Sequence, residues 1–148
     1  WSPDGRWLAY LESFDGRGDV ILAPTDGSGP TRRLTADPGA QPTASYGGGI
    51  LNWLDAATVI FVAPTGQLHA LPVTGGPTRQ LTNLTGRVAA PAASPDGRWI
   101  ACMVSGKTDQ HIVVVDATGV EWPRRVSRDG DFVFDPTISA DGSVAWQE

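Results

Sequence analysis

Cysteine is almost missing from this sequence. Cys102 is the only one in 148 residues, so no internal disulfide can form. Cysteine content therefore does not determine the cellular compartment, and the cytoplasm is the favoured expectation. Histidine is nearly as scarce, because His69 and His111 are the only two, and neither has a second histidine or a cysteine at ligand spacing. The sequence therefore predicts no metal and no cofactor.

Positive charge is also in short supply. The chain has 11 lysines and arginines against 16 aspartates and glutamates, a formal net charge of −5. An acidic chain without a basic patch argues against nucleic acid and anionic membranes as partners. No apolar run is long enough to span a bilayer, and no signal peptide is visible.

Sustained helical periodicity is absent, whereas glycine (18) and proline (12) are frequent. This composition indicates an all-β protein with many turns. The turns carry one recurring phrase, Ser-Pro-Asp-Gly followed by an apolar strand, at residues 2–10 and 94–102. Weaker copies occupy residues 53–61 and 139–146. Proline, aspartate and glycine each suit one position of a tight turn, and we expect Gly5, Gly97 and Gly142 at positive φ.

A second marker recurs with the same period. Leu34-Thr35, Leu81-Thr82 and Val126-Ser127 follow one another at a spacing of about 45 residues. A repeat of that length with several short strands is typical of β-propeller blades. The predicted fold is a partial β-propeller of four-stranded antiparallel blades, about three blades plus the start of a fourth.

The predicted blades lie at about residues 1–35, 48–82, 88–127 and 134–148. In the first, Trp1 is all that remains of the innermost strand. The crossing at 36–46 leads to Gly47-Gly48-Gly49, which opens the innermost strand of the second blade. The predicted strands are 6–11, 19–23, 31–35, 50–53, 58–62, 67–71, 78–82, 88–93, 99–104, 111–116, 123–127, 134–139 and 143–147.

The second strands of the repeat are apolar on both faces, which is expected of a sheet placed between two others. Residues 7–10, 59–62 and 100–104, with the third strand at 112–115, should form the core between blades. Cys102 takes the repeat position of Tyr10 and Phe61, so we interpret it as a buried filler and not a nucleophile.

No residue is predicted to be catalytic, cofactor-binding or metal-binding. His69 and His111 are interpreted as surface or half-buried residues of third strands, and Trp7 and Trp99 as packing residues. Ser28 lies in a turn, and no Gly-x-Ser-x-Gly elbow occurs. The spacing of Asp129-Gly130-Asp131 and Asp135 does not match a calcium loop.

The repeat resembles that of TolB-type propellers. The resemblance rests on Ser-Pro-Asp-Gly at residues 2–5 and 94–97, on Thr25-Asp26-Gly27 with Arg-Arg-Leu-Thr at 32–35, and on residues 75–82. Such repeats occur in TolB and in the N-terminal propeller of prolyl oligopeptidase family serine peptidases. Residues 34–42, and residues 134–136 running into 144–148, resemble bacterial members of the peptidase family more than TolB.

The peptidase resemblance implies a propeller that restricts access of peptide substrates to a C-terminal α/β-hydrolase domain of the same parent chain. None of the catalytic triad is present here, and the acidic pair that holds a substrate amino terminus in dipeptidyl peptidases has no counterpart. The chain itself is therefore expected not to be an enzyme. The alternatives are a TolB-like protein-binding propeller without enzymatic activity and a propeller from a sensor or lyase-like protein, since one fold hosts many functions.

Both ends of the sequence cut through a repeat unit, so the chain is expected to be an internal segment and to form an open arc of sheets. Trp7, Tyr10, Val144 and Trp146 are expected on blade faces that would meet missing neighbours. Exposed apolar faces of that kind favour association. Self-association of the isolated chain is the corresponding expectation.

Overall fold

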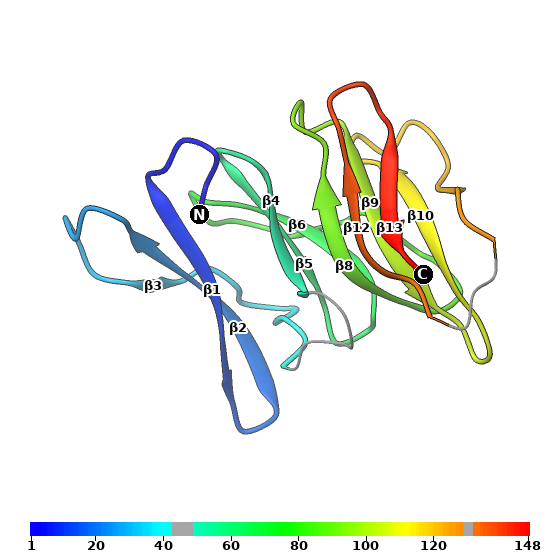
Figure 1. Cartoon of the computed structure of the whole chain (residues 1–148). Helices are drawn as coiled ribbons and strands as arrows, with labels where there is room; N and C mark the ends of the chain where they lie inside the picture. Colours follow the sequence, from blue (N-terminus) through cyan, green and yellow to red (C-terminus); the bar gives the residue numbers. More distant parts are fainter. Residues whose placement is uncertain (43–48, 129–131) are drawn as a thin grey trace.

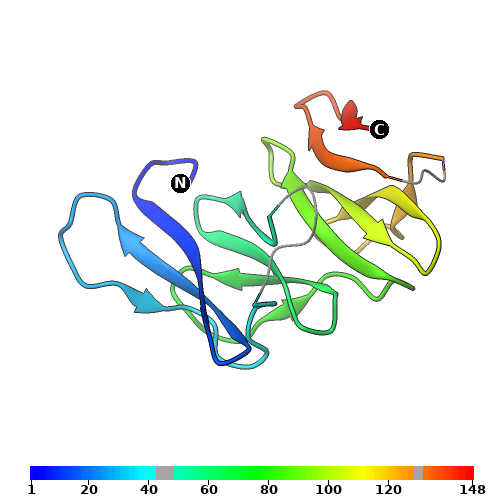
Figure 2. The ribbon, with the colours of Figure 1, turned by 60° about the horizontal axis from the view of Figure 1, so that its bottom comes forward.

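The fold is all-β. A computed structural model describes residues 1–42, 49–128 and 132–148. In those ranges the chain forms four antiparallel sheets that follow one another in sequence order, as a partial propeller does. Figures 1 and 2 show the sheets fanned in an open row from the N-terminal to the C-terminal sheet. No helix in the described ranges is long and apolar enough to cross a membrane.

The strands lie close to the predicted positions. The first sheet contains β1 (Trp7–Phe14), β2 (Arg17–Pro24) and β3 (Arg32–Arg33). The second contains β4 (Leu51–Asp55), β5 (Thr58–Val62), β6 (Leu68–Pro72) and β7 (Arg79–Gln80). The third contains β8 (Arg87–Ala93), β9 (Trp99–Ser105), β10 (Gln110–Asp116) and β11 (Arg124–Arg125), and the fourth β12 (Phe134–Ile138) and β13 (Val144–Gln147). Gly47 and Gly48, expected to open β4, lie outside the described residues.

The outer strands β3, β7 and β11 are shorter than predicted, with two residues each. The repeated marker, Leu-Thr or Val-Ser, explains this. Where the strand ends, the hydroxyl of the marker replaces a backbone carbonyl as hydrogen-bond acceptor. In each of the first three sheets a backbone N–H of the strand beside the outer one (β2, β6 or β10) donates to that hydroxyl instead of to a carbonyl. The three bonds join Val20 N to Thr35 Oγ1 (3.0 Å), Leu68 N to Thr82 Oγ1 (2.9 Å) and Ile112 N to Ser127 Oγ (2.8 Å).

The Ser-Pro-Asp-Gly turns have the predicted geometry. Gly5, Gly97 and Gly142 have φ values of 72°, 69° and 83°. In the first turn the Ser2 hydroxyl donates to Asp4 Oδ1 (2.6 Å) and accepts from the backbone N–H of Trp7 (2.9 Å). The copy at residues 94–99 repeats both bonds, at 2.5 and 2.9 Å. The copy at residues 139–143 closes more tightly, because the Ser139 N–H donates to the Ser143 carbonyl.

The core lies between the sheets. The second sheet is covered on both faces, so Val59, Ile60, Phe61 and Val62 have no exposed surface. In the third sheet the apolar runs at 100–104 and 112–115 are also buried, which confirms the predicted core there.

The first sheet departs from the prediction. Trp7, Ala9 and Leu11 pack against the core shared with the second sheet, but all of residues 7–10 remain only partly buried. The expectation that this strand is buried on both faces is therefore wrong, and so is the expectation that Trp7 lies on an open face. The described chain places a sheet against only one face of β1, and alternation turns Leu8 and Tyr10 to the other face.

The fourth sheet also differs from expectation. Val144 and Trp146 pack against apolar residues of the third sheet, with Met103 and Ile112 among them, and do not lie on an open face. Neighbouring positions such as Asp135, Thr137 and Gln147 are exposed. The exposed positions of this sheet thus include polar side chains, and self-association of the isolated chain stays a prediction.

Hydrogen bonds tie adjacent sheets to one another. The Arg32 guanidinium of the first sheet donates to the Val73 carbonyl at the end of the third strand of the second sheet. Arg79 of the second sheet repeats this with the Ala117 carbonyl of the third sheet, at 2.8 Å. The Asn52 side chain adds a bond to the Pro91 carbonyl (2.8 Å) between the inner strands β4 and β8.

Gly5 and Gly97 provide a matched test of this packing. Both have positive φ, so alanine should cost about 1–2 kcal/mol at either position through backbone strain alone. A Cβ at Gly97 would also lie 3.0 Å from the Leu54 carbonyl oxygen of the second sheet, whereas one at Gly5 meets nothing within 4 Å. Gly97→Ala should therefore lower the free energy of unfolding by about 1 kcal/mol more than Gly5→Ala. Urea denaturation measures both, and equal losses would show that the second and third sheets do not meet as described.

Candidate functional site

Cys102 lies on β9 with no exposed surface. Burial raises the pKa of its thiol to about 12, so the thiolate that a nucleophile requires does not form near neutral pH. The interpretation of Cys102 as a buried filler is confirmed.

His111 is half-buried on β10, as predicted, but it has a partner that the sequence did not indicate. Its Nδ1 lies 3.1 Å from Asp109 Oδ2, across the turn that enters the strand. In the described part of the chain, no hydroxyl or thiol hydrogen-bonds to the His111 ring. The pair therefore lacks the nucleophile that a hydrolytic site needs.

His69 differs from its prediction. It lies on β6 with only 7 % of its surface exposed, and its ring stacks on Phe61 with centroids 5.7 Å apart. Its Nδ1 is buried without a hydrogen-bond partner, and burial lowers the pKa of the ring. The position in β6 explains the burial, since Leu68, Ala70 and Leu71 of the same strand are also buried.

Ser28, Asp135 and residues 129–131 are the remaining candidates. Asp129, Gly130 and Asp131 lie outside the described residues, and Asp135 is exposed. Among the described residues, no group of three or more histidine, cysteine, aspartate or glutamate side chains could hold a metal. Ser28 lies in the turn after β2, where its N–H donates to Asp26 Oδ1 (2.9 Å).

Trp7 and Trp99 do not form a stacking pair. They occupy equivalent positions in the first and third sheets, and each lies near a guanidinium group. Arg32 lies 6.0 Å from the Trp7 ring centre, and Arg98 lies 4.7 Å from that of Trp99. The packing role predicted from their repeat positions is consistent with these contacts.

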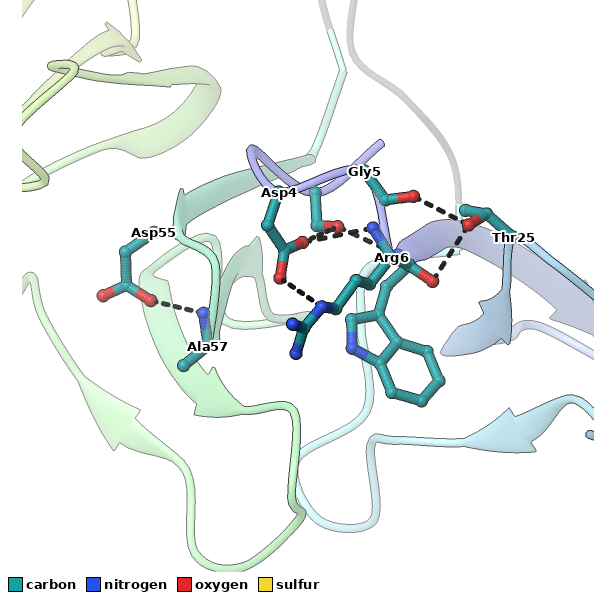
Figure 3. Close-up of polar contacts among 8 residues, drawn as sticks. Asp4, Gly5, Arg6, Thr25, Asp55 and Ala57 are labelled. Carbon is teal, nitrogen blue, oxygen red and sulfur yellow. Dashed lines mark hydrogen bonds and ion pairs between the residues drawn. The ribbon is translucent and has the colours of Figure 1, made fainter. Parts of the chain in front are cut away.

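One end of the sheets carries the Ser-Pro-Asp-Gly turns and the turns that enter the outer strands, and we call it the turn end. Five of its aspartates have lowered pKa values. The Ser2 hydroxyl, then the Arg6 backbone N–H, lower the pKa of Asp4. Figure 3 shows this carboxylate beside the backbone N–H and the side chain of Arg6. Hydroxyl hydrogen bonds likewise lower the pKa of Asp26, Asp96, Asp116 and Asp141, the last to about 2.

A shallow hollow of about 420 Å³ lies beside the first turn. Asp4, Arg6, Trp7 and Thr25 are part of its wall. The Thr25 hydroxyl donates to the Gly5 carbonyl (2.7 Å), so the polar groups here hold the turn to β2 (Figure 3). Over the described residues its wall has no histidine or cysteine, and the lowered pKa values of Asp4 and Asp26 make these carboxylates weak bases.

A larger hollow of about 830 Å³, which we call the rim groove, lies between residues 80–85 and residues 115–123. Leu81, Leu84 and Val115 are its apolar lining on the sheet side, and Val120 and Trp122 lie on the turn at its edge. Sequence reasoning missed this groove. The available signal was an apolar pair, Val120 and Trp122, in a turn that is otherwise small and polar in the repeat.

No family profile matches the sequence, and no curated protein matches it. Solved structures do match its fold over nearly the whole chain. A putative TolB from Agrobacterium tumefaciens shares 20 % identity at a TM-score of 0.76, over 99 % of this chain and 55 % of that one. TolB from Acinetobacter baumannii shares 20 % identity at a TM-score of 0.67, over 99 % of this chain and 36 % of that one.

A puromycin-hydrolyzing peptidase from Mycobacterium tuberculosis is equally similar in fold. It shares 23 % identity at a TM-score of 0.75, over 98 % of this chain and 26 % of that chain. The present chain thus spans between about a quarter and just over half of the structures that it matches. The likeness establishes that the chain has the TolB-type propeller fold. One of the structures that share this fold is a peptidase.

Buried, unpartnered His69 makes stability depend on pH. The folded pKa of the ring is lowered, so the unfolded chain takes up a proton first as pH falls below about 6.5. The free energy of unfolding should therefore decrease from about pH 7 towards pH 5. In His69→Leu this part of the decrease should disappear. Urea denaturation at the two pH values measures it, and an identical decrease in the variant would contradict the neutral, buried ring.

Proposed function

We propose that the chain is a non-catalytic propeller segment of a serine peptidase, which gates substrate access to an α/β-hydrolase domain outside this sequence. The observation that carries the proposal is a partial set of propeller repeats in which, among the described residues, no hydroxyl or thiol hydrogen-bonds to a histidine. The peptidase-like stretches at residues 34–42 and 134–148, and the fold shared with a puromycin-hydrolyzing peptidase, support it.

Gating follows from the construction of a propeller. Its sheets pack face to face through buried apolar side chains, so the wall between neighbouring sheets is closed to a folded protein. Short peptides can still pass along a central opening or between parts that move. The expected substrates of the parent protein are therefore short peptides, and this segment contributes shape and not chemistry.

A TolB-like protein-binding propeller without enzymatic activity is the second candidate. The exposed Val120 and Trp122 side chains favour it, because a fixed apolar patch on a surface turn is typical of a protein contact. The fold shared with two TolB structures also supports it.

A serine-directed fluorophosphonate label and short peptidyl substrates separate the candidates. Chain 1–148 should neither label nor turn over any substrate, because Cys102 is protonated and His111 has no nucleophile beside it. The full-length product of the gene should label at a serine outside this segment and should hydrolyse short peptides far faster than a folded protein.

Absence of labelling in the full-length product would reject the peptidase and leave the protein-binding propeller. Labelling of a serine within residues 1–148 would overturn both candidates. Equal hydrolysis of short peptides and folded proteins would reject gating while keeping the peptidase.

A further inference from the structure

The dipeptide Asp-Gly recurs in the turns of this chain, and it is a sequence at which aspartate rearranges readily. Because glycine has no side chain, its backbone nitrogen can reach the carboxyl carbon of the aspartate before it. Among the described residues, the aspartates that precede a glycine are Asp4, Asp15, Asp26, Asp96 and Asp141. One further pair, at 129–130, lies outside the described residues. The surroundings of each carboxyl group determine which of these pairs can react.

The Ser-Pro-Asp-Gly turns hold both groups that would have to meet. Asp96 Oδ1 accepts from the Ser94 hydroxyl (2.5 Å) and from the Arg98 N–H (3.1 Å). The Gly97 N–H, whose nitrogen would be the attacking atom, donates to the Ser94 carbonyl (2.8 Å). The two other copies of this turn repeat all three bonds. The carboxylate and the nitrogen are thus kept apart by hydrogen bonds to other groups.

The same bonds keep these carboxyl groups in their unreactive form. The serine hydroxyl, then the backbone N–H that follows, lower the pKa of Asp4, Asp96 and Asp141. At Asp26 the Ser28 hydroxyl and N–H have the same effect. An ionised carboxylate has no hydroxyl group to lose, so attack by a nitrogen does not lead to an imide.

Asp15 has neither protection. It lies with Gly16 away from the turn end, in the exposed hairpin that joins β1 to β2 (Figure 1). Within residues 1–42, 49–128 and 132–148, no donor or cation contacts the Asp15 carboxylate, and the Gly16 N–H has no acceptor. A Cβ added at Gly16 would meet nothing within 4 Å, so the turn also has room to rearrange.

The contacts that hold this hairpin to the rest of the chain lie on either side of its turn. The Ser13 hydroxyl donates to the Pro42 carbonyl, and the Arg17 guanidinium donates to the Ala36 carbonyl. The residues between them are all exposed. The turn itself is therefore held by the ladder of its own hairpin.

The backbone of the turn leaves the Gly16 nitrogen accessible. Phe14 pairs with Arg17, so Asp15 and Gly16 form a two-residue turn, and their φ values are 49° and 76°. Positive φ at both positions is typical of a type I′ turn, which Asp-Gly favours. Such a turn bonds the two flanking residues to each other and leaves the N–H of its second residue unpaired.

We propose that Asp15 is a modification site, at which the folded chain forms isoaspartate without an enzyme. A bond forms between the Gly16 nitrogen and Asp15 Cγ, and the hydroxyl of the protonated carboxyl group leaves with the amide proton as water. Water then opens the cyclic imide. Addition at Cγ restores aspartate, whereas addition at the Asp15 backbone carbonyl carbon leaves the main chain running through Cβ and Cγ. Water is the sole co-reactant, so the proposal goes beyond the proposed function and does not depend on it.

Conversion changes the hairpin that contains the site. Isoaspartate adds a methylene group to the main chain, and a two-residue type I′ turn has no room for it. Turn length sets the register of a hairpin, so the pairing of Phe14 with Arg17 should be lost in the modified chain.

Peptide mapping of chain 1–148, aged for several weeks near neutral pH, tests the proposal. Trypsin cuts after arginine, so residues 1–6, 7–17 and 88–98 form peptides that each contain one Asp-Gly pair. An isoaspartyl methyltransferase and fragmentation mass spectrometry measure isoaspartate in each. It should form in 7–17 about tenfold or more faster than in the other two, because there a hydrogen bond to an ionised carboxylate must break first.

Urea and two matched variants are the controls. In urea the hydrogen bonds of the turns are lost, so the three peptides should form isoaspartate at similar rates. In Asp15→Glu the peptide 7–17 should take up no methyl groups, because glutamate would have to close a larger ring, and in Asp26→Glu it should react as in wild type. Equal rates in 7–17 and 88–98 of the folded chain would overturn the proposal. So would a rate difference that persists in urea, or methylation of 7–17 that survives Asp15→Glu.

Discussion

Burial of the second sheet between the first and the third is the interaction on which the rest of the structure depends. Its central residues have no exposed surface, and each large apolar side chain buried in this way contributes about 1.5–3 kcal/mol. Strands β5 and β6 are stabilised by apolar burial on both faces, whereas β1 and β13 are stabilised by burial on one face within the described chain. Stability is therefore greatest in the middle of the row of sheets.

The polar part of each repeat keeps the sheets short and in register. A serine and an aspartate close the turn before the second strand, and a threonine or serine hydroxyl ends the outer strand after two residues. Arginine then reaches the next sheet's backbone. Because these groups satisfy buried backbone donors and acceptors, the apolar strands between them can be covered on both faces.

The sequence was sufficient to predict the repeat, the order of the strands and the buried role of Cys102, because each depends on local turn chemistry and on strand apolarity. It was insufficient for His69, Val144 and Trp146, whose burial depends on which face of a strand meets the next sheet. The Asp109–His111 contact depends on the shape of one turn. The rim groove depends on two sheets meeting, so Val120 and Trp122 stand out only when their turn is placed beside residues 80–85.

Native-state hydrogen exchange followed by NMR tests this distribution of stability most directly. If packing on both faces determines stability, the amides of β5, β6, β9 and β10 should exchange slowest, through opening of the whole structure. Those of β1 and β13 should exchange earlier, through local opening at the two ends of the row. Equal protection of β1 and β5, or faster exchange in β5 than in β13, would contradict the central role of the second sheet.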